Sequence, residues 1–337
     1  MRVFIFIATF LSIAVAGFFL FGSYATDHFT GSLKSEQRFD VRPNEDVLTL
    51  GKRLEESGII FSRYAFFWHL FHEEKTRQVI AGQYMLSGSL TIPEIALMLT
   101  SGETISRDIR VTFPEGWTAQ KMSERLTANS LPGEEFLILV QKPDPSWRTQ
   151  FDFLSDLPEH ASLEGYLFPD TYFFAPEAKA EDIIIAMLKN FGKRYDATLR
   201  QGVVQSGRSL FSIVILASII EEEGRTMEER DMISDIFWKR LAIGQPLQSD
   251  ATVNYIHGTT RLQPTLKDID VDSPYNTYRN KGLPPGPISS PSLMSLRAAI
   301  FPKSNPYFYF LVDLNTGETF FAETFEEHIR NRSLHGL

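Results

Sequence analysis

An uncharged apolar segment at the amino terminus constrains this chain more than any other feature. No charged residue occurs from Val3 to Thr26, and Phe, Ile, Leu, Val and Ala dominate Val3 to Phe21. A helix needs about 20 apolar residues to cross a bilayer, so this segment is long enough to span one. We therefore expect residues 1–26 to form a transmembrane anchor with a short cytoplasmic end.

A cleaved secretory signal is the alternative, because Ala14 to Ala16 resembles a small-residue cleavage site. Against cleavage, Gly17 to Phe21 continues the apolar run. Under both interpretations, the rest of the chain is exported across the membrane. Only the amine of Met1 and the side chain of Arg2 precede the span, which favours a cytoplasmic amino terminus. The expected location is the cell inner (cytoplasmic) membrane, with a single pass and the body of the chain in the periplasm.

Composition excludes several classes of function. The formal net charge is -9, and no cluster of Lys and Arg marks a phosphate-binding surface, so we expect no nucleic-acid partner. The chain has no cysteine, which excludes disulfides, thiolate metal sites and thiol nucleophiles. Its histidines lack metal-ligand spacing, and no G-x-S-x-G or S-x-x-K motif occurs. We expect neither a metal nor a cofactor, which leaves carboxylate chemistry.

The 337 residues are enough for more than one domain. After a polar tether, residues 27–38, we expect a small module at 39–104 with the order strand, helix, helix, strand, helix. Asn44 or Asp46 can cap its first helix, and Thr91 with Glu94 forms a capping box for its last. Such small units often bind sugar polymers, although a compact spacer explains the pattern equally well.

A second small strand-helix region and linker is expected at 105–155, followed by a larger, mostly helical domain at 156–337. Helices are predicted at Glu181 to Arg200, Ser209 to Glu223 and Met227 to Ile243, with a later β-hairpin around Asp313 to Gly317. The predicted fold class is α+β.

The most informative run is Ile213 to Ile220, which is apolar and ends in three glutamates at 221–223. On a helix, neighbouring side chains point about 100° apart, and Glu221 lies one turn after Ala217. A carboxyl set among aliphatic side chains loses hydration, which raises its pKa and suits it to act as a general acid. The alternative is a solvated helix end in which Glu221 pairs with Arg225.

Two later segments carry groups typical of a sugar site. Gln248, Asp250, Asn254 and Tyr255 combine amide, carboxyl and aromatic groups, although Asp250 also fits a helix cap. The segment 273–288 is a long proline-stiffened loop, which is typical of a functional segment or a boundary. Its tyrosines can stack on pyranose rings while Gln248 and Asn276 bind N-acetyl or hydroxyl groups. The alternative is a loop that serves as scaffold.

These segments make the chain resemble the MltG/YceG-like family of endolytic murein transglycosylases. The resemblance rests on Leu216 to Glu221, Glu229 to Asp231, Arg240 to Asp250, Tyr275 to Tyr278 and Gly282 to Ile288. It extends to Leu163 to Tyr172, to the apolar segment, and to Ala81 to Tyr84, which is similar to the family's LysM-like module. Ser249 and Ala251 depart from the Thr and Pro expected there.

The resemblance implies that Glu221 is the catalytic glutamate of a LysM-containing lytic transglycosylase, a lyase without a cofactor. The residues expected to bind substrate are Ser218, Glu223, Gln248, Asp250, Asn254, Tyr255, Tyr275, Asn276, Thr277, Tyr278, Leu283, Pro284 and Pro285. Its substrate is then the bond between N-acetylmuramic acid and N-acetylglucosamine in nascent peptidoglycan, cut to leave 1,6-anhydro ends and to set strand length. Peptidoglycan synthases are the implied partners.

Two alternatives remain open. An inverting peptidoglycan hydrolase would use Glu221 as the acid and either Asp250 or Glu223 to activate water. A non-catalytic glycan-binding scaffold of the cell-wall machinery would carry Glu221 as a helix-end charge.

Overall fold

The computed structural model describes residues 26, 30–102, 108–259, 264–313 and 316–335. The expected anchor and part of the expected tether fall on residues 1–25 and 27–29, outside the described residues. Within the described ranges, no single helix has the length and apolar character needed to cross a membrane. The chain divides after Arg107 into two compact units, which are described separately.

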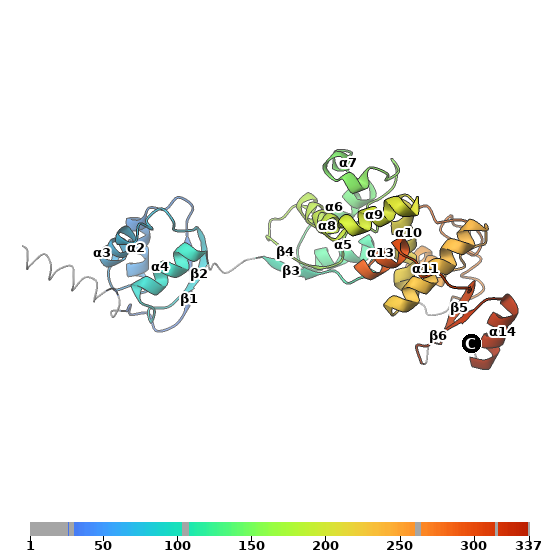
Figure 1. Ribbon diagram of the computed structural model, residues 1–337. Coiled ribbons are helices and arrows are strands. Elements are labelled where there is room, and N and C mark those ends of the chain that lie inside the picture. The colour runs from blue at the N-terminus through green and yellow to red at the C-terminus, as the bar shows by residue number, and fades with distance from the viewer. Residues whose placement is uncertain (1–25, 27–29, 103–107, 260–263, 314–315, 336–337) are drawn as a thin grey trace, which may run out of the picture. The chain divides into compact units, whose positions relative to one another are not determined.

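The smaller unit has the expected order of strand, helix, helix, strand, helix. Its elements are β1 (Gln37–Val41), α2 (Val47–Glu56), α3 (Arg63–His72), β2 (Gly82–Leu86) and α4 (Ile92–Ser101) (Figure 1). Strands β1 and β2 are antiparallel, with Phe39 opposite Tyr84. The helices pack Leu54, Phe66 and Leu99 into one buried cluster, so the unit has a hydrophobic core of its own.

Local sequence explains where these helices begin and end. Asp46 caps α2, accepting hydrogen bonds from the backbone amides of Leu48 at 3.1 Å and Thr49 at 3.0 Å. Thr91 and Glu94 form the expected capping box of α4. Gly102 then ends α4 with φ 77°, a left-handed conformation that glycine adopts without steric cost.

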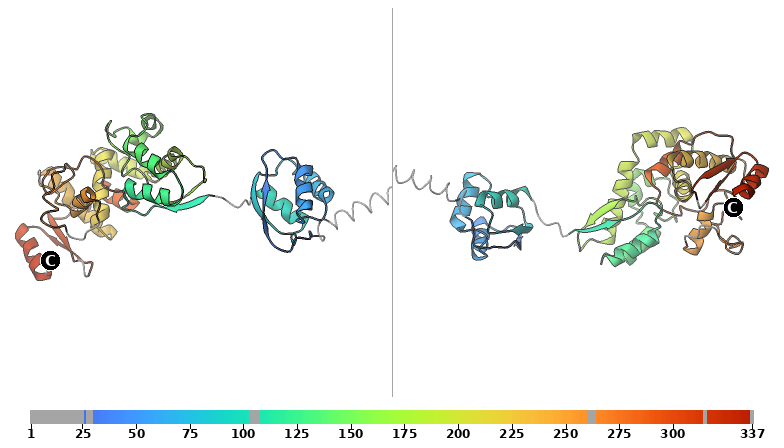
Figure 2. Two further views of the ribbon diagram at one scale, coloured as in Figure 1. Left: turned by 180° about the vertical axis from the view of Figure 1, so that it is seen from behind. Right: turned by 90° about the horizontal axis from the view of Figure 1, so that it is seen from below.

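The larger unit is mixed α and β with helices predominating (Figure 2). In chain order its elements are β3 (Ile109–Thr112), α5 (Ala119–Ala128), α6 (Gly133–Gln141), α7 (Trp147–Gln150), η1 (Asp152–Leu154), β4 (Thr171–Phe174), α8 (Ala180–Arg194), α9 (Ala197–Ser206), α10 (Leu210–Glu223), α11 (Met227–Ala242), α12 (Asp250–His257), α13 (Leu293–Ile300), β5 (Tyr309–Val312), β6 (Thr319–Ala322) and α14 (Phe325–His335). The mixed α+β class is therefore confirmed.

The separate region expected at 105–155 is instead an integral part of this unit. Strand β3 pairs antiparallel with β4, which places Ile109 opposite Phe174. Helices α5 and α6 contribute Met122 and Phe136 to the same buried cluster as α10. A boundary near Asp156 would divide this core, and the pairing of two strands so far apart in sequence is invisible to local periodicity.

The helix predicted from Glu181 to Arg200 is in fact two helices. Helix α8 ends at Arg194, and Asp196 caps α9 by accepting a hydrogen bond from the backbone amide of Leu199 at 2.9 Å. The cap competes with helix continuation because a short carboxylate side chain satisfies a free amide of the new helix.

Candidate active site at the end of helix α10

Helix α10 presents its three glutamates at the carboxyl end of a fully buried segment. Ser209 caps its start, accepting from the backbone amide of Ser212 at 3.1 Å. Every side chain from Ile213 to Ile220 is buried, and Gly224 ends the helix. Because successive residues point about 100° apart, the three glutamates face three different sets of neighbours.

Glu221 is held by a cation and a serine. Its Oε1 accepts from Arg230 Nη2 at 3.0 Å, and its Oε2 accepts from the backbone amide of Ser292 at 2.8 Å and from the Ser292 hydroxyl at 2.5 Å. The side chains of Glu221 and Arg230 are only 6% and 7% exposed. The Glu221 carboxyl therefore lies against a guanidinium and a serine instead of the expected aliphatic side chains, and its ion-pair partner is Arg230 instead of Arg225.

Arg230 extends this contact into a buried network. Its Nε donates to the backbone carbonyl of Gly224 at 2.9 Å, and its Nη1 donates to the Ser292 hydroxyl at 2.8 Å. Ser292 in turn caps α13, accepting from the backbone amide of Ser295 at 3.2 Å. The network joins the ends of α10, α11 and α13, which is a structural role for Glu221.

Glu223 lies in a different environment. The Ser249 hydroxyl donates to its Oε1 at 2.5 Å, and no full ion pair neutralises it among the contacts of the described chain. Burial raises the pKa of Glu223 to about 7, against the hydrogen bond from Ser249, and the charge of Asp250 raises it further. A carboxyl with a pKa near neutrality can both give and take a proton, as a general acid and base must.

Asp250 and Tyr278 lie in the same cluster. The Tyr278 hydroxyl donates to Asp250 Oδ1, and burial raises the pKa of both groups. Asp250 is the first residue of α12, and Ser249 occupies the cap position. The Ser249 hydroxyl does not cap α12. It donates its hydrogen bond to the carboxyl of Glu223 instead.

Asn276 and Thr277 were both expected to bind substrate. Their side chains are instead buried, and their hydrogen bonds hold the loop in place. The Asn276 side-chain amide donates to the backbone carbonyls of Ile269 at 2.9 Å and Val271 at 2.8 Å. The Thr277 hydroxyl accepts from the backbone amide of Ser249 at 3.0 Å. Both side chains are at most 2% exposed, so they position the loop and α12 without reaching a ligand.

Ser218 is likewise a structural anchor. Its hydroxyl donates to the backbone carbonyl of Ile215 at 2.7 Å and accepts from the backbone amide of Ile288 at 2.9 Å. The side chain is fully buried. Ser218 therefore fixes the proline-stiffened loop to α10. Within that loop Pro284 is buried, Leu283 is half-buried and Pro285 is exposed.

The remaining expected residues keep surface that a ligand can reach. Gln248 is exposed and has φ 52°. Tyr255 and Tyr275 are half-buried, with ring centroids 5.0 Å apart, and Asn254 is half-buried with its Oδ1 accepting from the Thr259 hydroxyl at 3.2 Å. These four side chains, with Tyr278, are the candidates for sugar contacts.

Glu164 was not predicted as a functional residue. It is 6% exposed, and both carboxyl oxygens accept from the backbone amide of Ala119, at 3.0 and 3.1 Å. Burial raises its pKa to about 8; burial also raises the pKa of Tyr255 and Tyr275, and the charge of Glu164 raises both further. The one sequence signal is an acidic residue inside the apolar run 163–168.

We expect Glu164→Gln to stabilise the protein at alkaline pH. The folded state raises the pKa of this carboxyl from 4.5 to about 8, so the wild-type free energy of unfolding falls as pH rises between those values. Glutamine keeps the acceptor for Ala119 without the buried charge. A gain of about 1 kcal/mol or more corresponds to a melting temperature higher by about 2–4 °C at alkaline pH. Thermal melts at pH values below and above this window test it, and a difference independent of pH would contradict it.

Comparisons with known proteins show the family to which this chain belongs. The YceG-like family matches residues 39–333. A protein of Bacillus subtilis strain 168 named endolytic murein transglycosylase is 32% identical over 93% of this chain and 89% of its own length. A protein of Streptococcus pneumoniae strain D39 with the same name is 29% identical over 97% of this chain, which spans 64% of that relative.

A solved structure of a YceG-like protein from Listeria monocytogenes has the same fold. It is 32% identical, superposes with a TM-score of 0.60, and covers 88% of this chain and 99% of its own. Since the family match extends over most of both units, the chain belongs to the YceG-like family.

Proposed function

We propose that this chain is an endolytic lytic transglycosylase that cuts the bond between N-acetylmuramic acid and N-acetylglucosamine in peptidoglycan. Support for the activity comes from the curated relatives named endolytic murein transglycosylase. The observation that carries the chemistry is the half-buried Glu223 carboxyl, which has a pKa of about 7 and accepts a hydrogen bond from Ser249. We therefore transfer the role of acid and base from Glu221 to Glu223.

In the first step, protonated Glu223 gives its proton to the glycosidic oxygen. Ser249 holds Oε1, which leaves Oε2 to carry the proton. The bond from the muramic acid C1 to that oxygen breaks, and its electron pair goes to the leaving N-acetylglucosamine. The positive charge developing at C1 is stabilised by the N-acetyl oxygen of the substrate, as in substrate-assisted glycosidases.

In the second step, ionised Glu223 takes the proton of the muramic acid C6 hydroxyl. The C6 oxygen then bonds to C1, which gives the 1,6-anhydro end and restores the protonated acid. No water is consumed. The intramolecular attack is favoured by proximity when the ring is held in a dry site.

The neighbouring residues take supporting roles in this proposal. Asp250 and Tyr278 form a hydrogen-bonded pair near Glu223, whose pKa is raised mainly by burial and further by the charge of Asp250. Tyr255 and Tyr275 supply ring faces for pyranose stacking, and Gln248 supplies an amide for N-acetyl or hydroxyl groups. Glu221 keeps the helix ends together.

The proposed location rests on the sequence, and the proposed partners rest on the family resemblance. We propose that residues 1–26 anchor the protein in the inner membrane, with both compact units in the periplasm. We also propose that the smaller unit is a LysM-like glycan-binding module. By cutting nascent strands beside the peptidoglycan synthases, the protein would then set the length of those strands. Support comes from the uncharged segment Val3 to Thr26 and from the strand and helix order of the smaller unit.

The mass of the products tests the reaction. Intact sacculi digested with the purified protein are expected to yield muropeptides with 1,6-anhydro ends. Reducing ends, about 18 Da heavier by one water, would instead indicate the inverting hydrolase. An unchanged digest from a folded protein would indicate a glycan-binding scaffold.

A further inference from the structure

Helix α3 of the smaller unit has two apolar sides, only one of which is used by the core. Phe66 and Leu70 are fully buried in the unit. On the opposite side, Tyr64 is 72% exposed and Phe71 is 60% exposed. These two residues are seven positions apart, two turns of helix, so they share a face with Trp68 between them. We call Tyr64, Trp68 and Phe71 the aromatic stripe.

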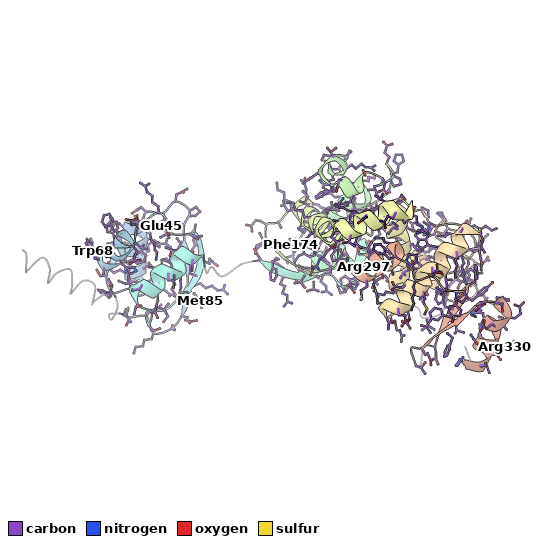
Figure 3. All side chains as sticks on the ribbon, viewed as in Figure 1. Glu45, Trp68, Met85, Phe174, Arg297 and Arg330 are labelled. Carbon is purple, nitrogen blue, oxygen red and sulfur yellow. The ribbon has the colours of Figure 1, made fainter. Side chains whose placement is uncertain are left out.

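Neighbouring rings hold the stripe in place. Trp68 stacks on His72 with centroids 6.2 Å apart and an interplanar angle of 7°, and Phe67 stacks on Phe71 at 6.0 Å. The Arg63 guanidinium lies 5.9 Å from the Tyr64 ring centre. Figure 3 shows Trp68 at the margin of the smaller unit. Tyr64 and Phe71 are exposed and Trp68 is half-buried between them, and such an apolar face is unusual for a surface that meets only water.

Charges near the stripe are largely compensated. Arg63 forms an ion pair with Glu55 at 2.5 Å, and Lys75 forms one with Glu73 at 3.6 Å. Among the described residues 63–75, Arg63 and Lys75 are thus both paired, so this part of the surface offers no cluster of unpaired Lys or Arg that would recognise phosphate groups. Attraction to a partner must come from the rings themselves.

The chain enters the smaller unit close to the start of α3. The backbone amides of Ser32 and Leu33 donate to the carbonyl of Gly58 at 2.8 and 2.9 Å. Ser62, the cap of α3, follows only four residues after Gly58. The apolar segment ends at Phe21, so a fully extended chain from there to Ser32 reaches at most about 40 Å.

We propose that the aromatic stripe of α3 lies in the interfacial layer of the membrane that holds the anchor. Tyr and Trp are enriched at the level of the lipid headgroups, and a helix with one apolar face can lie in that plane. The proposal rests on the anchored location proposed above. The stripe then keeps the smaller unit at the bilayer surface.

A glycan strand is the competing occupant, but another part of the unit suits it better. A depression of about 420 Å³ lies between β1 and α2, lined by Gln37, Arg38, Asp40, Arg53 and Glu56 among others. Its hydrogen-bonding side chains match the hydroxyl groups of sugars. The stripe offers the bare ring of Phe71 instead.

Tryptophan quenching by brominated lipid tests the proposal. The full chain is reconstituted in vesicles of phosphatidylcholine and phosphatidylglycerol, with phosphatidylcholine brominated on the upper part of its acyl chains. Trp117, Trp147 and Trp238 emit in both the wild type and Trp68→Phe, so the difference reports on Trp68 alone. We expect quenching in the wild type that Trp68→Phe loses, and the same quenching at high salt because the contact is apolar.

Matched variants locate the contact. Tyr64→Ser with Phe71→Ser is expected to reduce Trp68 quenching at least twofold, whereas Leu97→Ser, at a 60% exposed site on α4, leaves it unchanged. Equal quenching of wild type and Trp68→Phe would overturn the proposal, as would a Trp68 emission shift caused by soluble glycan strands. Failure of the protein to float with vesicles would overturn both this contact and the anchor. Cleavage of added sacculi, measured separately, reports on the enzymatic proposal independently.

Discussion

Replacement of Glu223 by glutamine is expected to slow glycan cleavage by about a thousandfold or more. General acid and base catalysis contributes about 10²–10⁴-fold, and a single residue here serves both steps. Glutamine has the same shape and still accepts the hydrogen bond from Ser249, but it holds no transferable proton. Release of 1,6-anhydro ends from purified glycan strands measures the rate.

Two neighbouring glutamates provide the controls for this variant. Glu222→Gln changes an exposed carboxyl one residue away and is expected to keep most of the activity. Glu221→Gln weakens the contact with Arg230 and is expected to lower stability more than the rate per folded molecule. A folded Glu221→Gln protein without activity, beside an active Glu223→Gln protein, would return the catalytic role to Glu221.

Replacement of Arg230 by methionine is expected to give the largest loss of stability. Removing one partner of a buried ion pair leaves the other charge uncompensated and costs about 3–5 kcal/mol. For a unit of this size that corresponds to a fall of roughly 10 °C in melting temperature. Thermal unfolding followed by circular dichroism measures it.

The control for that variant is Arg297→Met, an exposed arginine on α13 that is expected to change stability by at most about 0.5 kcal/mol. Adding Glu221→Met to Arg230→Met should recover part of the loss because no buried charge is then left unpaired. An Arg230→Met protein that melts like the wild type would show that the network of Glu221, Arg230 and Ser292 contributes little.

The sequence predicts the local parts of this fold well. The cap at Asp46, the capping box of Thr91 and Glu94 and the hairpin of β5 and β6 depend on residues close together in the chain. The pairing of β3 with β4 and the buried position of α5 and α6 depend on distant contacts. No local pattern carries that information, which is why the boundary near Asp156 was misplaced.

The surroundings of Glu221 and Glu223 could not be predicted for a related reason, and the catalytic role of Glu221 stays a prediction beside our proposal of Glu223. The prediction from the sequence assumed that α10 has one inward stripe, which Ala217 would mark. Helix α10 is instead buried on all sides from Ile213 to Ile220, so helical phase cannot say which glutamate faces a cavity and which faces a partner. The deciding contacts come from Arg230, Ser249 and Ser292, which lie elsewhere in the sequence.

Residue types around the site were predicted more successfully than their roles. The sequence placed Asp250, Tyr255, Tyr275 and Tyr278 in one region, and the structure brings Asp250 into contact with Tyr278 and Tyr255 into contact with Tyr275. Asn276 shows why the role of a side chain could not be predicted. An amide that binds sugar and one that binds backbone carbonyls look identical in a sequence, and only the fold reveals its two carbonyl partners.

The pH dependence of kcat/KM for release of 1,6-anhydro ends tests the assignment of Glu223 most directly. The rate is expected to fall as pH rises through about 7, because the acid loses its proton there, and the position of this fall should be unchanged in Glu164→Gln. A rate that stays level to about pH 9, or a fall that moves when Glu164 is replaced, would contradict the assignment.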